Sequence, residues 1–398
     1  MGNWYVPPIE GEITKEEIKG MSDKIHFWDF EPLFEFKTMG YDDVLDDLKS
    51  YNQKMYDEAD DTRKEEIVQE IIAIYRSVNL FPITYYSHEG MLNEIEKCRN
   101  YDATFNGNTV SCGAGIGTGI CKQLFPNIFD TPSAHDLDKK DAETQYKKFL
   151  NDEYLARAIK FCFSYKDGVP TPVNVEGGLR LIGSAPSNFR PMNAKAIYER
   201  FTPEGGTIWD YCAGFGGRML GALSSKKNFK YVATDPNTET MYHLHELAEL
   251  IEEVTGREDS YELHCCGSEV FKGKPNSIDF AFSSPPYFDL EVYSDEPTQC
   301  FNKFPELEGW LEGYVRQTIK NLYYMLKPGA CYAVNIADFT VHGGKEVSYV
   351  DAWREISEQE GMPLYTTFYL GVTARAGSAE QSSGELKKEA IMVFKKPE

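Results

Sequence analysis

From Asn193 onward, short apolar strands alternate with helical segments. The hydrophobic spacing predicts helices over 193–201, 217–225, 238–254 and 307–326, and strands over 207–211, 230–234, 261–265, 278–282 and 330–336. Such alternation builds a parallel sheet with helices on both faces. Two later strands, 366–372 and 389–396, flank a polar loop and predict an antiparallel hairpin on that sheet.

A glycine-rich turn, within TIWDYCAGFGGRML, follows the first of these strands. Asp210 ends the strand, and Gly214 and Gly216 precede the next helix. Glycines let the backbone approach a ligand, and a helix start offers free N–H donors. Asp235 ends the next strand, where an acid accepts hydrogen bonds from a ribose in doubly wound nucleotide folds. An ordinary tight turn, a dehydrogenase and a methyltransferase would all share this pattern.

The fourth strand leads directly into Ser284-Pro285-Pro286-Tyr287, in the run SIDFAFSSPPYFD. Two consecutive prolines cannot continue a helix or a strand ladder, so the chain leaves the sheet edge as a rigid turn with a fixed carbonyl direction. Alone, Pro-Pro-Tyr is also typical of a surface turn or a polyproline ligand. Its position at the end of an apolar strand, after a glycine-rich turn and an acid, favours a catalytic turn.

With these motifs, residues 190 to 397 resemble the S-adenosylmethionine-dependent DNA amino-methyltransferases that modify cytosine N4 or adenine N6. Their signature is Asp, Asn or Ser followed by Pro-Pro-Tyr. The FRPMNAK segment, the LKPGA turn and the closing hairpin extend the resemblance. It implies an α/β class I methyltransferase (Rossmann-like) fold, a doubly wound, mostly parallel sheet with a C-terminal antiparallel hairpin. It also implies S-adenosyl-L-methionine as cofactor, with these cofactor residues: Asn193, Asp210, Gly214, Phe215, Gly216, Asp235, Ser268 and Glu269.

The resemblance also implies the catalytic residues Ser284, Pro285, Pro286 and Tyr287. In such enzymes the target amine donates hydrogen bonds to the first proline's carbonyl and to the preceding side chain. Acceptors on both hydrogens make an aromatic amine more pyramidal and nucleophilic, and the methyl sulfonium then needs only in-line placement. Tyr287 is expected to stack on a flipped-out base, with Phe288 and Arg218 as further substrate residues.

DNA is the expected substrate, as in restriction-modification systems, with RNA as the alternative. Cytosine N4 is favoured over adenine N6 because, in the resembling family, serine before Pro-Pro-Tyr is commoner among cytosine enzymes. A catalytically silent methyltransferase-like subunit is a second alternative. The intact glycines and proline pair favour an active enzyme. A separate specificity subunit or a homodimer could supply further recognition.

The net charge limits the kind of nucleic-acid binding site that the protein can have. A formal net charge of -22 excludes a surface that is basic all over, so any nucleic-acid site must be a local basic patch. Nine cysteines show no C-x-x-C pair and no zinc-type spacing, which predicts reduced thiols and no metal. The sequence shows no apolar signal segment and no membrane-length run, so a cytoplasmic protein without membrane contact is expected.

The sequence suggests three regions. Residues 1–165 are predicted to be mainly helical, most clearly from Asp42 to Asn79. They are also expected to carry substrate recognition, with the loop at 289–305 as an alternative, since little sequence separates the glycine turn from the SPPY motif. Residues 166–192, rich in Pro, Gly and Ser, are predicted to be a connecting segment, and residues 193–398 the methyltransferase domain.

Weaker candidates have structural interpretations. The run CGAGIGTGI (112–120) resembles a second nucleotide loop, but no clear strand frames it, so a packing role is favoured. His264, Cys265 and Cys266 are expected to fill the core rather than bind a metal. Several basic residues could contact phosphates, although a solvated charge is the expected role of each: Arg180, Arg190, Lys195, Arg218, Arg375, Lys387 and Lys388.

Overall fold

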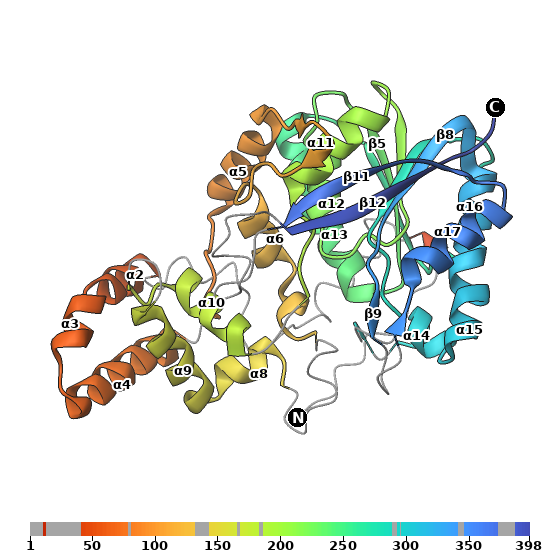
Figure 1. Ribbon diagram of the computed structural model, residues 1–398. Helices are drawn as coiled ribbons and strands as arrows, with labels where there is room; N and C mark the ends of the chain where they lie inside the picture. Colours follow the sequence, from red (N-terminus) through yellow and green to blue (C-terminus); the bar gives the residue numbers. More distant parts are fainter. Residues whose placement is uncertain are drawn as a thin grey trace. The chain divides into compact units, whose positions relative to one another are not determined.

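The computed structural model describes residues 11–12, 41–78, 81–131, 143–164, 168–182, 186–288, 293–294, 296–340, 346–372 and 387–398. These residues form two compact units (Figure 1). One contains the described residues between Ser22 and Ser87 and between Pro126 and Ser187. The other contains residues 11–12, His88–Phe125 and the described residues of Asn188–Glu398.

The second unit is built on a ten-stranded sheet in the order β1-β6-β5-β4-β7-β8-β12-β11-β3-β2. The strands β4 to β8 are parallel, whereas β12 runs antiparallel to both β8 and β11. The strand bounds are β1 Gly11–Glu12, β2 Phe105–Asn106, β3 Thr109–Val110, β4 Thr207–Asp210, β5 Lys230–Asp235, β6 Tyr261–Cys265, β7 Ile278–Ser283, β8 Leu326–Asn335, β11 Leu364–Val372 and β12 Lys387–Lys395. A separate short pair joins β9 Phe339–Thr340 to β10 Glu346–Val347.

This strand order confirms the predicted class I methyltransferase fold. From β4 the chain winds outward to β5 and β6, then returns to β7 and β8 on the other side of β4. The strand order therefore reverses between β4 and β7, which is where open α/β sheets bind their ligands. The predicted C-terminal antiparallel hairpin is confirmed as β11 and β12.

Helices cover this sheet, and the four predicted segments 193–201, 217–225, 238–254 and 307–326 agree closely with α11, α12, α13 and the run from α15 to α16. The helices are α5 His88–Asn100, α6 Thr118–Leu124, α11 Pro191–Phe201, α12 Gly217–Leu223, α13 Thr238–Thr255, α14 Cys300–Lys303, α15 Leu307–Trp310, a π-helical turn at Leu311–Val315, α16 Arg316–Met325 and α17 Tyr349–Gln359. Helix α17 was not among the predicted helices. Its buried Tyr349, Trp353 and Ile356 recur at helical spacing, a signal strong enough to have found it.

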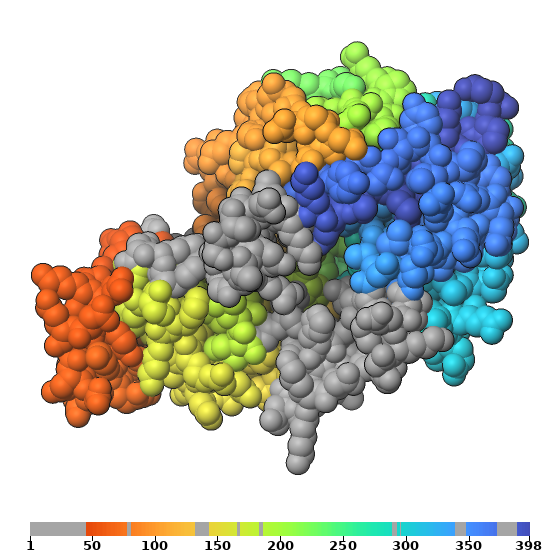
Figure 2. Space-filling model, viewed as in Figure 1, coloured from red at the N-terminus to blue at the C-terminus, as the bar shows by residue number. Residues whose placement is uncertain are grey.

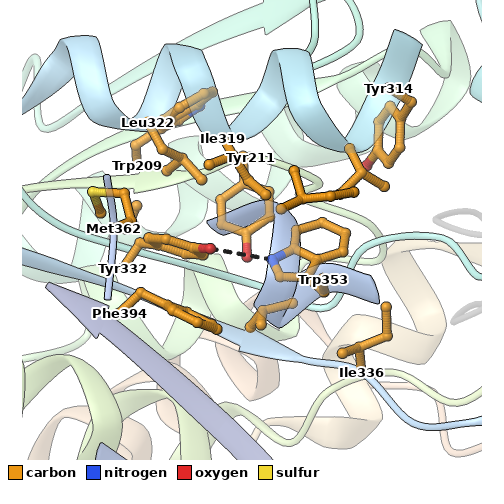
Figure 3. Close-up of a cluster of buried hydrophobic side chains, with 14 of the residues drawn as sticks. Trp209, Tyr211, Tyr314, Ile319, Leu322, Tyr332, Ile336, Trp353, Met362 and Phe394 are labelled. Carbon is orange, nitrogen blue, oxygen red and sulfur yellow. Dashed lines mark hydrogen bonds between the residues drawn. The ribbon is translucent and has the colours of Figure 1, made fainter. Parts of the chain in front are cut away.

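Alternating strand side chains form a separate core on each face of the sheet. Trp209, Tyr332 and Phe394 point to the face that α16 and α17 cover, where they pack with Ile319, Leu322 and Trp353 (Figure 3). The Trp353 indole N–H donates a hydrogen bond to the Tyr332 hydroxyl over 3.3 Å, so the polar ends of two buried rings satisfy each other. On the opposite face, Phe280 and Phe282 contact Tyr198 of α11 edge to face.

Residues 88–125 belong to the sheet unit, contrary to the prediction that 1–165 form one region. Strand β3 pairs in parallel with β11, with Tyr369 opposite Thr109. In Figure 2 the orange surface of this segment accordingly adjoins the blue C-terminal strands. A pairing between segments so distant in sequence leaves no mark on local periodicity.

The first unit is helical in its described part, with α2 Tyr41–Lys49, α3 Gln53–Glu58, α4 Asp61–Val78, a 3-10 turn at Pro126–Phe129, α8 Gln145–Leu150, α9 Asp152–Phe163 and α10 Pro172–Ile182. The predicted helical pattern over 42–79 is confirmed as α2 to α4. The predicted connecting segment at 166–192 is wrong in its middle, because α10 packs on α9. A Cβ on Gly178 would lie 2.7 Å from the Ala158 carbonyl oxygen, so this glycine permits close helix contact.

No helix in the described part of the chain is long and apolar enough to cross a membrane.

Candidate functional site

The glycine turn and the SPPY motif meet at the point where the strand order reverses. The turn follows β4 and the motif follows β7, and these are neighbouring parallel strands whose carboxyl ends share one edge of the sheet. The Ser283 hydroxyl donates a hydrogen bond to the Cys212 carbonyl oxygen over 3.0 Å. The two sequence motifs are therefore joined directly.

The glycines of the turn have different roles. Gly214 and Gly216 have φ of 57° and 75°, which favour glycine. A Cβ on Gly216 would lie 2.5 Å from the Phe125 ring, and one on Gly217 would lie 2.0 Å from the Phe189 carbonyl oxygen. Among the described residues, a Cβ on Gly214 would approach nothing closer than 3.8 Å. Gly216 and Gly217 thus admit close protein contacts, whereas the backbone at Gly214 is open to a ligand.

Asp235, at the end of β5, binds the glycine turn. One carboxylate oxygen accepts the Gly214 N–H over 2.9 Å and the other accepts the Asn237 N–H over 3.0 Å. Burial raises the pKa of Asp235 to about 6, although these two hydrogen bonds oppose the shift. The structure thus brings Asp235 and Gly214 together, as the nucleotide-site prediction requires.

Asp210 and Arg218 form a buried ion pair beneath the turn. The Arg218 Nε lies 2.8 Å from Asp210 Oδ2, with the side chains 6% and 0% exposed. The Tyr231 hydroxyl donates to the same oxygen over 2.7 Å, and Arg218 also binds the Cys212 carbonyl. Arg218 therefore stabilises the glycine turn from its buried side. The prediction that Arg218 contacts the substrate is wrong, because its guanidinium is engaged by Asp210 and the Cys212 carbonyl.

Ser268 and Glu269 follow β6 and contact neighbouring helices. The Ser268 and Thr318 hydroxyls lie 2.9 Å apart, and Asn321 donates to the carbonyls of Ser268 and Glu269 over 3.0 Å each. Glu269 Oε1 lies 2.5 Å from Lys303 Nζ on α14. The Ser268 hydroxyl is thus engaged in packing rather than open to an adenine ring.

The SPPY motif divides between the candidate site and the core. Ser284 is half-buried, and its hydroxyl donates to the Asn335 carbonyl over 3.3 Å. Pro285 is buried, and Pro286 and Tyr287 are half-buried. Phe288 is 6% exposed with φ of 30°, and its ring meets those of Phe301 and Trp310 edge to face at 6.0 and 5.9 Å. Phe288 therefore anchors the turn in the core instead of lining the substrate pocket predicted for it.

The segment after the motif returns to the cofactor side, a relationship that sequence reasoning missed. Glu296 accepts hydrogen bonds from the Thr238 N–H and hydroxyl at the start of α13, both over 3.1 Å. The Thr298 hydroxyl donates to the Pro236 carbonyl over 3.2 Å, and the Tyr293 ring lies 6.1 Å from that of Phe215. Tyr293, Glu296 and Thr298 thus contact the two loops that follow β4 and β5.

Asn193 and Lys195, both buried on α11, hold neighbouring segments. The Asn193 amide oxygen accepts the Cys112 N–H over 2.9 Å, so it fixes the 112–120 loop. Lys195 Nζ donates to the carbonyls of Cys98, Arg99 and Tyr101 at the end of α5. Asn193 therefore does not take the cofactor role predicted for it, and the solvated charge expected of Lys195 is wrong, because Lys195 is buried. A Cβ on Gly117 would meet Leu220 at 2.7 Å, which agrees with the predicted packing role of the loop.

The remaining candidates have other contacts. Cys265 is buried, and His264 Nε2 lies 2.8 Å from Glu262. Within the described ranges no three His, Cys, Asp or Glu side chains are grouped to hold a metal ion. Arg180 lies in the helical unit, 3.9 Å from Glu176, while Arg190 is half-buried and Lys388 is exposed. Arg375 and the side chain of Lys387 lie outside the described residues.

Three of the solved structures similar to this chain are methyltransferases of low sequence identity. A TehB-like SAM-dependent methyltransferase from Corynebacterium glutamicum is 15% identical, with a TM-score of 0.33 over 53% of this chain and 89% of that one. A SAM-dependent methyltransferase from Methanosarcina mazei is 14% identical, with a TM-score of 0.35 over 50% and 97%. The geranyl diphosphate C-methyltransferase of Streptomyces coelicolor is 10% identical, with a TM-score of 0.35 over 49% and 74%. No protein-family model and no curated protein sequence matches the chain.

Proposed function

We propose that this protein transfers a methyl group from S-adenosylmethionine to an exocyclic amino group of a base in DNA. The observation that carries the proposal is the direct junction of the two motifs. Ser283, next to the SPPY turn, is hydrogen bonded to Cys212 of the glycine turn across the reversal point of the sheet. A methyl donor on one turn and an amine on the other would therefore be neighbours.

The residues around the glycine turn fit this cofactor. The open backbone at Gly214 permits close approach, and the Asp235 carboxylate can accept hydrogen bonds from ribose hydroxyls. When bound, the cofactor supplies an electrophilic methyl group on a sulfonium. Asp210 cannot take a similar role directly, because Arg218, Tyr231 and the turn already engage its carboxylate.

The SPPY turn supplies acceptors for the target amine. Because the Ser284 proton is directed to the Asn335 carbonyl, the lone pairs of the Ser284 oxygen remain for an incoming N–H. The Pro285 carbonyl is the second acceptor. Two such contacts would orient the nitrogen lone pair and make it more nucleophilic, and Tyr287 would stack on the extruded base.

Cytosine N4 is the proposed target atom, and adenine N6 is the alternative. A neutral serine hydroxyl is a weaker acceptor than a carboxylate, yet both bases present an amine with two hydrogens. Groups that read the Watson–Crick edge decide between the bases. The preference for cytosine therefore rests on the resemblance of the motif.

The test is transfer of labelled methyl from S-adenosylmethionine to DNA, RNA and protein in parallel, followed by mass analysis of nucleosides. We expect label in DNA as N4-methylcytosine, and loss of transfer in Ser284→Ala with cofactor affinity retained. N6-methyladenine without N4-methylcytosine would overturn the base assignment. Label only in RNA or protein would overturn the substrate, and no transfer to any of the three would contradict an active enzyme.

A further inference from the structure

The amino edge of the central sheet, where the parallel strands begin, is rich in basic residues. It consists of the segments at the starts of β4, β5, β6, β7, β8 and β11 and at the end of β12, which runs antiparallel to β8 and β11. These segments are residues 202–206, 224–230, 256–261, 270–277, 325–329, 360–364 and 395–398. They hold nine Lys or Arg and five Asp or Glu, whereas the whole chain holds 41 and 63. This edge therefore carries a positive balance on a protein whose formal net charge is -22.

Contacts between these segments join the starts of β7 and β8 and the end of β12 into one surface. The Asn276 N–H donates a hydrogen bond to the Tyr324 carbonyl oxygen over 3.2 Å, and Lys396 Nζ donates to the Asn276 amide oxygen over 2.8 Å. Lys272 Nζ lies 4.5 Å from the centre of the Tyr324 ring, and Lys396 Nζ lies 4.8 Å from the centre of the Tyr323 ring. The lysines and tyrosines of these segments are therefore close neighbours.

The exposed side chains of this surface are available to a partner. We define the amino-edge patch as Lys272, Lys274, Tyr323, Tyr324 and Lys327. The two tyrosines are 40% and 37% exposed, and all three lysines are exposed. Lys327 pairs with a carboxylate of β7 over 2.7 Å, whereas Lys272 and Lys274 form no ion pair within the described part of the chain. The Tyr324 ring attracts the Lys272 ammonium and holds it in place without neutralising its charge.

The basic residues form a row along the sheet edge, and a row fits a linear polyanion better than a small ligand. The strands from β6 to β12 follow the order β6-β5-β4-β7-β8-β12, so at about 4.8 Å between neighbours the row spans roughly 24 Å. Each strand of duplex DNA carries one phosphate per about 3.4 Å of helix axis, so this length faces about seven base pairs. Lysine ammonium and tyrosine hydroxyl groups both donate hydrogen bonds to phosphate oxygens.

We propose that the amino-edge patch binds the phosphate backbone of duplex DNA without reading its sequence. The patch lies at the opposite end of the strands from the glycine turn and the SPPY motif, as the positions of the C-terminus and β9 in Figure 1 show. The DNA held there is therefore not the segment whose base is methylated, and holding it keeps the enzyme close to further target bases. The surface is separate from the proposed methyl-transfer site, but the choice of DNA over another polyanion rests on the proposed function.

The test measures how the affinity for DNA depends on salt. Fluorescence anisotropy on the full chain follows binding of a labelled duplex of about 20 base pairs between about 50 and 200 mM salt. Lys272→Gln combined with Lys274→Gln should lower the slope of log affinity against log salt concentration by about 2, since each lost phosphate contact removes about 0.9. The loss should be the same for duplexes of different sequence. The matched control combines Lys49→Gln with Lys54→Gln, which removes the same charge from exposed positions of the helical unit and should keep the slope of the unmodified protein.

An unchanged slope in the Lys272 and Lys274 double variant, or an equal decrease in the control, would overturn the inference. Poly-glutamate that displaces the DNA at equal charge concentration would indicate an acidic protein partner and would also overturn it. The methyl-transfer assay separates this inference from the proposed function. DNA that binds with the expected salt dependence but receives no methyl group would support the amino-edge patch and contradict the proposed function, whereas methyl transfer to DNA with an unchanged slope would do the reverse.

Discussion

Arg218 Nε lies 2.8 Å from Asp210 Oδ2, and this ion pair is almost fully buried beneath the glycine turn. It joins the end of β4 to the first turn of α12. The attraction of Asp210 keeps the pKa of Arg218 above its usual value although burial acts to lower it. Both residues were predicted to contact ligands, and their actual partners are each other.

Replacing Arg218 should therefore destabilise the fold. Arg218→Met leaves the Asp210 carboxylate buried without a cation, and we expect a loss of about 3–5 kcal/mol in the free energy of unfolding. Urea denaturation measures it. The double variant Asp210→Asn with Arg218→Met should recover part of the loss, because no charge is then buried alone. A single variant as stable as the unmodified protein would contradict the structural role of the pair.

Gly217 should tolerate no side chain. In Gly217→Ala the new methyl group would meet the Phe189 carbonyl at 2.0 Å, so the turn and the segment before α11 must separate. We expect about 1–3 kcal/mol of destabilisation and weaker binding of S-adenosylhomocysteine. Gly115→Ala is the matched control, since its Cβ meets nothing within 4 Å in the part of the chain that the structure describes. Equal melting temperatures for the two variants would show that the close approach is not real.

Cofactor affinity should fall in acid because of Asp235. Burial raises the pKa of this carboxyl to about 6, so the carboxylate that accepts ribose hydroxyls predominates above that pH and is lost below it. Calorimetry with S-adenosylmethionine at about pH 5 and about pH 7.5 should show tighter binding at the higher value. In Asp235→Asn this difference should shrink, and an undiminished pH dependence there would assign the titration to another group.

The same raised pKa affects folding in the opposite direction. The native state holds the Asp235 proton to a higher pH than the unfolded chain does, so its contribution to stability is largest below the unfolded pKa. That contribution is lost as pH rises through about 6. Raising the pH through about 6 should therefore strengthen cofactor binding and, through the same carboxyl, lower the free energy of unfolding.

Tyr287 and Phe288 are adjacent, yet their substitutions should have different effects. Tyr287→Ala should reduce methyl transfer far more than cofactor binding, because its proposed partner is the target base. Phe288→Ala should instead lower the free energy of unfolding by about 3–5 kcal/mol, since the ring lies in the core against Trp310. Transfer assays, calorimetry and denaturation on both variants separate these roles, and equal loss of transfer and binding in Tyr287→Ala would indicate a structural tyrosine.

Sequence alone was sufficient for the order of the sheet strands from β4 to β12 and for α11, α12, α13 and α16, but it did not give α14 or α17. Apolar periodicity, the glycine turn and the proline pair are local signals, and the strand ends they mark converge because parallel strands share one carboxyl edge. The pairing of Asp235 with Gly214 follows from that geometry. The expected role of residues 1–165 in substrate selectivity stays a prediction.

Only the tertiary structure determined the partners of several polar and aromatic residues, because these partners lie far away in the sequence. Arg218 is a polar residue whose burial depends on Asp210 from the preceding strand, and Asn193 binds a loop 81 positions earlier in the chain. Phe288 belongs to the core only because α14 and α15 fold back over it. Glu296 has no motif of its own, and only the return of its segment to α13 brings it to the Thr238 N–H and hydroxyl. A residue's periodicity records which face it shares with near neighbours, whereas its partners depend on which distant segments the fold brings beside it.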